Sequence, residues 1–118
     1  MKEIGGNITA QLQIKNGSSK NAIGEKIINW QTVITLFGYL DYQAGDSNYN
    51  SFDSKVQEST HVFLCDWQEL PANVNAENSR MIINGLRYDV MLIDDPMELH
   101  YQWEIYLKFV GEQQNGES

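Results

Sequence analysis

The sequence lacks three things that would place it in a familiar class: paired cysteines, long apolar runs and a surplus of basic residues. Its one cysteine, Cys65, cannot form an intramolecular disulfide, and no Cys/His cluster has zinc spacing, so hydrophobic burial has to hold the fold. No apolar run approaches the roughly 18 residues of a membrane helix. Residues 1–6 also lack the basic start and apolar stretch of a signal peptide. We therefore expect synthesis and folding in a cytosol-like compartment, without membrane contact.

Acidic residues outnumber basic ones by sixteen to eight, which gives a formal net charge of -8. A general nucleic-acid binder is disfavoured, because phosphate neutralisation needs clustered Lys and Arg. The charges are unevenly distributed along the chain. Residues 1–40 carry four basic and two acidic residues, whereas residues 41–118 carry four basic and fourteen acidic ones. Whatever surface the second part builds is expected to be acidic.

The 118 residues, of which 42% are hydrophobic, predict one modest domain (1–118) with a single core. Apolar residues alternate along residues 8–14, the period of a strand with one buried face. Turn-forming residues dominate 16–25, which we expect to be an exposed connection. Residues 27–42 are dense in β-branched and aromatic side chains and predict the longest strand. Gly38 within it suggests a bulge or sharp bend that would let a short sheet curl until it closes.

Four further segments predict strands in the second half of the chain. Residues 60–66 have strand character, which ends before Pro71 and the polar run 73–79. Asn84-Gly85 predicts a tight turn pairing residues 80–84 with 87–93, because both residues tolerate the positive φ of a type I′ turn. A last strand at 101–110 alternates apolar and polar residues, and the tail 111–118 is polar. The fold class expected is all-β, a small antiparallel barrel or sandwich of five to six strands.

The longest predicted connection, residues 41–58, separates the second and third strands and is poor in residues that can pack. Connections of this length are uncommon in compact domains and tend to be functional or disordered, so it is a candidate working part. An idle surface loop is the alternative. The candidate residues in it are Asp41, Tyr42, Gly45, Asp46, Asn48, Tyr49, Phe52, Asp53, Lys55 and Glu58.

The densest group of chemically active side chains is Asp94, Asp95 and Glu98, with His100 close behind. Three carboxylates and an imidazole can bind a divalent cation, but they lack the EF-hand spacing, and a turn with Asp accepting backbone hydrogen bonds and Pro96 fixing φ explains the same residues. No phosphate-binding glycine loop is present, and no cofactor is expected.

Cys65 is the only candidate sulfur nucleophile. His61 is four residues away on one strand, roughly 13 Å along the chain, so these two side chains cannot touch within it. A pairing of Cys65 with His100 from another strand is left open, although no recognised cysteine-enzyme signature surrounds Cys65. A buried cysteine acting as a small hydrophobe is the alternative.

The three tryptophans are candidates for base or sugar stacking. Trp30 and Trp103 occupy alternating strand positions, which favours core packing for both. Trp67 stands beside a predicted loop and is expected to be the more open ring.

The order of these signals resembles the small head-tail adaptor (head-closure, connector) proteins of tailed phages and prophages, over residues 8–111. The similarity rests on an N-terminal strand, a glycine-containing loop, a tryptophan-bearing strand, a long loop and a hairpin followed by an Asp-Pro turn. The stretches that carry it are Gly38-Tyr39-Leu40-Asp41, Ser59-Thr60-His61-Val62-Phe63, Tyr88-Asp89-Val90, Ile93-Asp94-Asp95-Pro96 and Glu104-Ile105-Tyr106-Leu107.

The resemblance implies a small β-barrel that assembles as a ring beneath the portal and its adaptor, closes the filled head and offers a surface to the tail. It implies no enzymatic activity. Carried over from similar proteins, the role of a loop that enters the channel and holds DNA back falls on residues 41–58. The partners implied are portal and adaptor ring proteins, tail proteins, further copies of the chain and, non-specifically, the packaged DNA. The location implied is the head-tail interface of the virion, after synthesis in the bacterial cytoplasm.

Three other functions remain open from the residues alone. One is a tail-completion or minor capsid subunit with a similar barrel. Another is a β-barrel module that binds a peptide or sugar through Trp67 and exposed tyrosines. The third is an enzyme that uses His100 with Asp94, Asp95 or Glu98.

Overall fold

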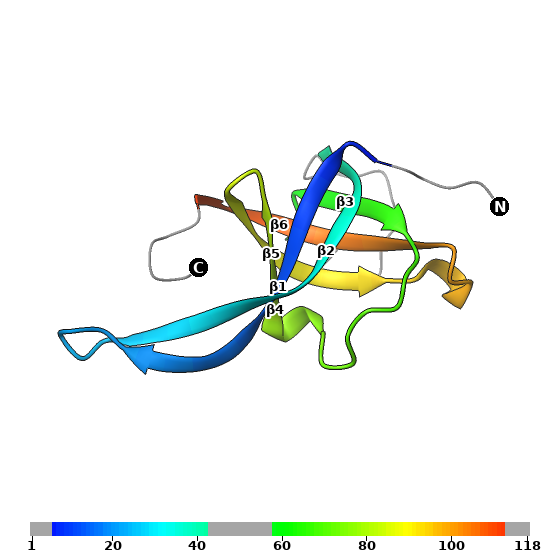
Figure 1. Cartoon of the computed structure of the whole chain (residues 1–118). Helices are drawn as coiled ribbons and strands as arrows, with labels where there is room; N and C mark the ends of the chain where they lie inside the picture. Colours follow the sequence, from blue (N-terminus) through cyan, green and yellow to red (C-terminus); the bar gives the residue numbers. More distant parts are fainter. Residues whose placement is uncertain (1–5, 43–57, 113–118) are drawn as a thin grey trace.

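The computed structural model describes residues 6–42 and 58–112, which contain six strands and two 3₁₀ turns (Figure 1). The elements are β1 (Ile8–Lys20), β2 (Lys26–Tyr42), β3 (His61–Asp66), η1 (Ala76–Asn78), β4 (Ser79–Ile83), β5 (Leu86–Asp94), η2 (Pro96–Glu98) and β6 (Gln102–Glu112). The prediction of an all-β protein is confirmed.

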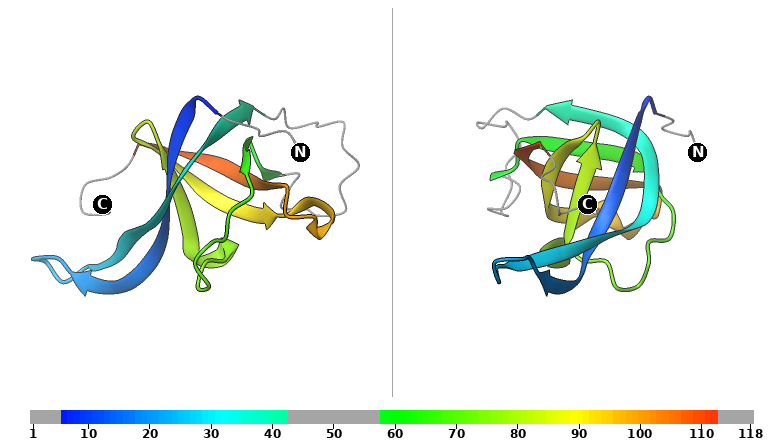
Figure 2. Two further views of the ribbon diagram at one scale, coloured as in Figure 1. Left: turned by 45° about the vertical axis from the view of Figure 1, so that its right-hand side comes forward. Right: turned by 60° about the vertical axis from the view of Figure 1, so that its left-hand side comes forward.

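The six strands form one closed antiparallel barrel in the order β1-β2-β3-β6-β5-β4, and β1 pairs with β4 to close it. Of the two architectures predicted, the structure is therefore the barrel (Figure 2). Each strand pairs with two neighbours over part of its length, which closes the ring of strands. Among the described residues, β2 before Gly38 and β5 after Asp89 each pair on one side only.

The barrel is filled by side chains from all six strands, as expected when alternate residues of each strand face inward. Leu12 and Phe63 are among the fully buried ones. The rest of the buried cluster comprises Ala10, Leu36, Cys65, Met81, Ile83, Tyr88, Val90, Ile105 and Leu107. Burying an aliphatic or aromatic side chain of this size contributes about 1.5–3 kcal/mol, so this cluster supplies the main stabilisation of the fold.

Gly38 marks the point where β2 changes partner. Before it β2 pairs with β1, and from Gly38 to Tyr42 it pairs with β3. A Cβ at position 38 would overlap the carbonyl oxygen of Leu64 and lie 2.9 Å from the Cβ of Cys65. The register has no shift at Gly38, so the predicted bulge is not there; a glycine is required because β3 approaches closely. The register shifts lie elsewhere on the β1–β2 pair, between Leu12 and Gln13 and between Lys15 and Ser18.

The prediction of an exposed connection at residues 16–25 is wrong in its bounds. β1 continues to Lys20, and only residues 21–25 connect the strands. Asn21 Oδ1 accepts the backbone N–H groups of Ile23 (3.1 Å) and Glu25 (2.9 Å) and thereby shapes the tip. Gly17 (φ 77°) lies at the register shift between Lys15 and Ser18. The turn-forming residues here therefore form a bulge, and the pairing of β1 with β2 resumes after it.

The extended hairpin projects from the barrel as an arm, which we define as residues 15–30 (Figures 1 and 2). β1 pairs with β4 only as far as Ile14, so within the described residues the arm is a two-stranded ribbon. The molecule extends 51 × 30 × 24 Å, and its radius of gyration of 14.9 Å exceeds the roughly 13 Å expected of a compact domain of this size.

The remaining strand predictions hold to within a few residues. Asn84 (φ 53°) and Gly85 (φ 76°) form the predicted turn between β4 and β5. β6 begins one residue after Tyr101 and continues through Gly111 to Glu112, so the polar tail is shorter than predicted, and residues 113–118 lie outside the described part.

Candidate functional site

The long loop predicted to enter a channel falls mostly outside the described residues. Asp41 and Tyr42 are not in a loop but are the last two residues of β2, paired with Val62 and His61. Both side chains are exposed, as is that of Glu58. The candidates Gly45, Asp46, Asn48, Tyr49, Phe52, Asp53 and Lys55 lie in 43–57, outside the described residues.

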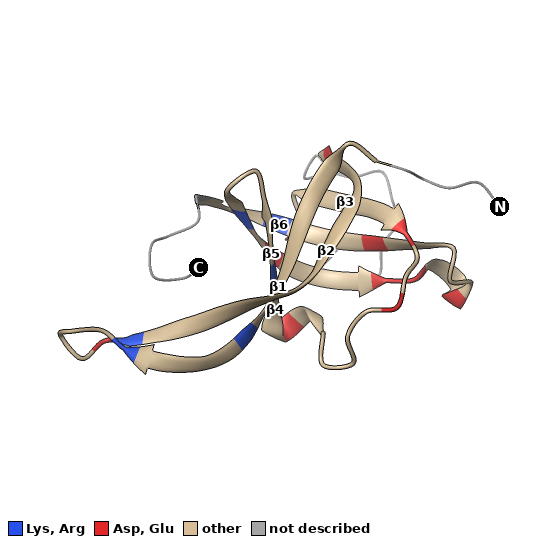
Figure 3. Cartoon of the chain, in the orientation of Figure 1, with Lys and Arg blue, Asp and Glu red and all other residues tan. Residues whose placement is uncertain are grey.

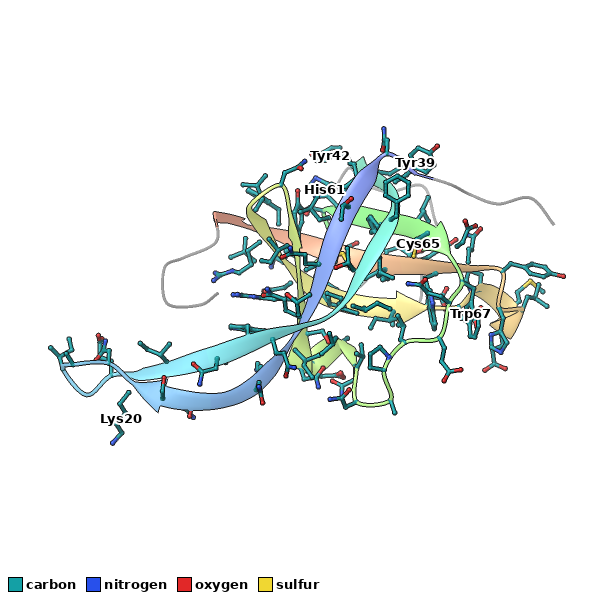
Figure 4. The ribbon with its side chains drawn as sticks, in the orientation of Figure 1. Lys20, Tyr39, Tyr42, His61, Cys65 and Trp67 are labelled. Atoms are coloured by element: carbon teal, nitrogen blue, oxygen red, sulfur yellow. The ribbon has the colours of Figure 1, made fainter. Side chains whose placement is uncertain are left out.

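An aromatic cluster surrounds His61 where β2 ends. The His61 ring meets Tyr42 edge-on at 5.5 Å and Tyr88 edge-on at 5.2 Å, and Phe109 lies 6.4 Å away. Figure 4 shows Tyr42 and His61 close together on this side of the barrel. Burial lowers the pKa of His61, so the ring is neutral at pH 7 and suited to packing. Its Nδ1 lies 2.8 Å from Thr60 Oγ1, and that oxygen accepts the Phe109 N–H.

Cys65 points into the barrel and is 2% exposed. Burial, with a smaller contribution from Asp66, raises the pKa of its thiol to about 11. A nucleophilic cysteine requires a thiolate, which this environment disfavours. The contacts of both histidines lie elsewhere: His61 packs in the aromatic cluster and His100 against Trp67. The described residues therefore do not assemble the Cys65–His100 pair.

The Asp94-Asp95-Pro96 segment forms the predicted turn between β5 and β6. Asp95 Oδ1 accepts the backbone N–H of His100 at 3.0 Å, and Asp95 Oδ2 contacts His100 Nδ1. Burial raises the pKa of Asp94, and the carboxylates of Glu104 and Asp95 raise it further. In the described part of the chain, His, Cys, Asp and Glu do not gather in a group of three that could hold a metal ion.

The tryptophan predictions are confirmed for Trp103 and wrong for Trp30. Trp103 packs against the core, and its Nε1 donates to the carbonyl of Gln68 at 2.7 Å. Trp30 is half-buried and covers the guanidinium of Arg80, 4.4 Å from the ring centroid. It lies on the arm, where β2 extends beyond the barrel wall. Alternate side chains of the strand therefore no longer face the barrel core there.

Trp67 stacks on Trp103 at 6.1 Å and lines an apolar groove of about 590 Å³. Leu70, Pro71 and Ile93 also line this groove. The Trp67 Nε1 atom is buried and meets no acceptor among the described residues.

A second groove lies in the angle between the arm and the barrel, with a volume of about 650 Å³; we call it the elbow groove. Four of the eight basic residues line it, two from the arm and two from the β4–β5 hairpin: Lys15, Lys26, Arg80 and Arg87. Its own carboxylates are Glu77 and Asp89, and its apolar lining includes Ile27, Ile28, Trp30, Val90 and Met91. In a chain of net charge -8, this is a locally basic surface with an apolar floor.

The elbow groove has a rigid base. Arg80 is 1% exposed, and its Nε donates to Gln13 Oε1 at 2.7 Å across the β1–β4 seam. Gln13 Nε2 in turn donates to Thr32 Oγ1 on β2 at 3.1 Å. A buried guanidinium under an aromatic face contributes on the order of 1–2 kcal/mol and fixes the position of the ring.

Sequence reasoning did not identify this groove. The positive balance of residues 1–40 was the available signal, but Arg80 and Arg87 join Lys15 and Lys26 only through barrel closure. No sequence pattern places a β4 residue beside an arm that was predicted to be a loop.

Comparison with known proteins shows no family: neither a protein-family model nor a curated protein matches the sequence. Among the described residues, no helix is long and apolar enough to cross a membrane.

Proposed function

We propose that this chain is a structural subunit of a tailed phage or prophage, a head-tail connector or head-closure protein that forms a ring under the portal. In this role it retains packaged DNA and offers the tail its attachment surface. The proposal rests on the resemblance over residues 8–111 and on one structural observation, the two-stranded arm that projects from a closed barrel.

The arm supports an assembly role because isolated two-stranded hairpins are marginally stable in water. Among the described residues, β1 beyond Ile14 and β2 before Gly38 pair only with each other, so the arm presents two outer strand edges to a neighbour. A projecting ribbon with exposed Ile23 and Ile28 is suited to contact a neighbouring subunit.

The acidic balance is compatible with a conduit for DNA. Negative charge repels phosphate at short range and leaves DNA without a binding site as it passes. Most carboxylates of the described residues belong to the barrel and its connections (Figure 3).

The test is sedimentation and negative-stain imaging of the protein with purified portal and adaptor rings from the same genome, beside the protein alone. Saturable binding as a ring on the portal side supports the proposal. Deletion of residues 43–57 is then expected to let packaged DNA leak, measured as nuclease-sensitive DNA in otherwise complete heads. Binding to tail tubes, with none to the portal complex, favours a tail-completion or minor capsid subunit instead.

A peptide- or sugar-binding module is the second candidate, favoured by the apolar groove beside Trp67, whose buried indole N–H meets no acceptor among the described residues. Binding to neither portal nor tail tubes, with a change in tryptophan fluorescence on adding peptides or oligosaccharides, would support it. Trp67→Phe, which retains the ring contact and removes the donor, would then weaken binding.

A further inference from the structure

The two ends of the molecule carry opposite charges. The arm contains Lys15, Lys20 and Lys26 and a single carboxylate, Glu25, and Lys15 and Lys26 also line the elbow groove. Figure 3 shows this mainly basic arm at one end of the molecule. Carboxylates gather at the other end, where β3, β5 and β6 meet their connecting segments (Figure 3). They belong to Asp66, Glu69, Asp94, Asp95, Glu98 and Glu104.

The acidic end carries a protruding turn, residues 95–101, which we call the end knob. Met97 is 85% exposed, and Leu99 and Tyr101 are also exposed, beside the carboxylate of Glu98. Exposed apolar side chains grouped within one short turn are typical of a contact surface.

The end knob is held in an unusual backbone conformation. Met97, Glu98 and His100 have φ between 56° and 59°, a region that residues other than glycine seldom adopt. Asp95 fixes the turn through its two contacts with His100, and the His100 ring lies tilted against Trp67 with the ring centroids 4.6 Å apart. Strained residues persist only where the surroundings hold them, so the knob is preorganised before it meets a partner.

We propose that copies of this chain join head to tail, with the end knob of one copy seated in the elbow groove of the next. The knob supplies apolar side chains and carboxylates, and the groove supplies an apolar floor and cations. Lys15 and Lys26 reach the groove from the arm, so the arm forms one wall of the docking surface.

Charge disfavours a contact between like patches. A two-fold dimer centred on the elbow groove alone or on the end knob alone would set basic groove against basic groove or acidic knob against acidic knob. A heterologous contact pairs unlike patches and gives a ring where the rotation closes. The like-charge repulsion that helps raise the pKa of Asp94 would be relieved by the approaching lysines. This inference deepens the proposed connector function and rests on it for ring closure.

Disulfide trapping tests the contact directly. One copy carries Ile28→Cys in the groove, and a second copy, enlarged by a tag, carries Met97→Cys on the knob. The native Cys65 is buried and does not compete. After mild oxidation we expect the mixed dimer to exceed either like-with-like dimer by about fivefold, the ratio that about 1 kcal/mol of preferred contact produces.

The matched control replaces Ile28→Cys by Tyr39→Cys, since Ile28 and Tyr39 are similarly exposed (37% and 41%) and Tyr39 does not line the groove. Both pairings are measured with the protein alone and on the portal complex. Equal yields for the 28–97 and 39–97 pairings in both settings would overturn the proposal.

Charge reversal supplies a second measurement. In the trapping pair, Lys26→Glu in the groove copy or Glu98→Lys in the knob copy is expected to lower the 28–97 yield about threefold. The two reversals together are expected to restore it, because the unlike charges again face each other. If single reversals leave the yield unchanged, or the combination does not recover it, the docking assignment is wrong.

The same variants separate this inference from the proposed function. If the wild-type protein binds the portal as a ring but the cysteine variants give no preferred 28–97 pairing, the function is retained and the contact is refuted. Preferred pairing without any binding to the portal retains the contact and refutes the function.

Discussion

At the scale of single residues, Asp94 gives the clearest dependence on pH. Its pKa is raised, so the folded state binds this proton more tightly than the unfolded chain does. The stabilisation from protonated Asp94 is therefore present at low pH and is lost as pH rises through the folded pKa. Asp94→Asn is expected to increase the free energy of unfolding at pH 7, by less than about 1 kcal/mol because the site is partly solvated. The gain over wild type should shrink toward pH 4.

Urea unfolding between pH 4 and pH 7 measures this difference. Asp41→Asn, an exposed carboxyl at the end of β2, serves as the control for loss of one negative charge. If the Asp94 variant is less stable than wild type at pH 7, the carboxylate makes a favourable contact that outweighs its burial and repulsion.

Residue-level predictions from sequence succeeded where a local rule decides the conformation. The turn at Asn84-Gly85 requires only two residues that tolerate positive φ, and the turn at Asp95 requires only backbone N–H groups within reach of its carboxylate. Both turns were therefore predicted correctly. Trp30 was assigned to the core because alternation cannot show where a strand leaves the barrel wall. Its contact with Arg80 joins residues fifty positions apart and has no local signal.

At the scale of elements, β2 depends on Gly38 to serve two neighbours. Gly38→Ala would force its Cβ into the backbone of Leu64, so we expect a loss of about 3 kcal/mol in the free energy of unfolding. Thermal and urea unfolding followed by circular dichroism measure it. Gly24→Ala is the control, because a Cβ there meets open space and costs only about 1 kcal/mol for its positive φ. Equal losses in the two variants would show that the close approach of β3 is relaxed at small cost.

Strand positions were predictable because burial imposes a period of two on each inward face. The bounds of β1 were not, because the arm buries little and its residues carry no such pattern. Turn-forming residues at 16–25 were interpreted as a break, whereas the backbone ladder continues past the bulge through cross-strand hydrogen bonds. A strand that pairs through its backbone but buries few side chains does not show the alternation of apolar and polar residues that identifies strands in a sequence.

At the scale of the whole molecule, the opposite charges of the two ends follow from the order of the chain. The basic first forty residues build β1, β2 and the arm, and the acidic remainder builds most of the barrel and the end knob. This division was visible in the sequence. The elbow groove was not, because it exists only after β1 and β4 close the barrel and bring Arg80 beside the arm.

The arm is expected to contribute to shape and assembly but little to stability. Replacing residues 19–27 with Asn-Gly joins the paired residues Ser18 and Ile28 by a two-residue turn and leaves the barrel intact. We expect Tm to change by no more than about 4 °C, because exposed residues away from the core contribute only tenths of a kcal/mol. The frictional ratio in sedimentation velocity should fall, since the 51 Å dimension includes the arm.

A full-length variant with Lys20→Ser and Lys26→Ser separates length from charge and should retain the wild-type frictional ratio. A large loss of Tm on shortening would instead mean that the arm packs on the barrel, and the elbow groove would then be closed to a partner.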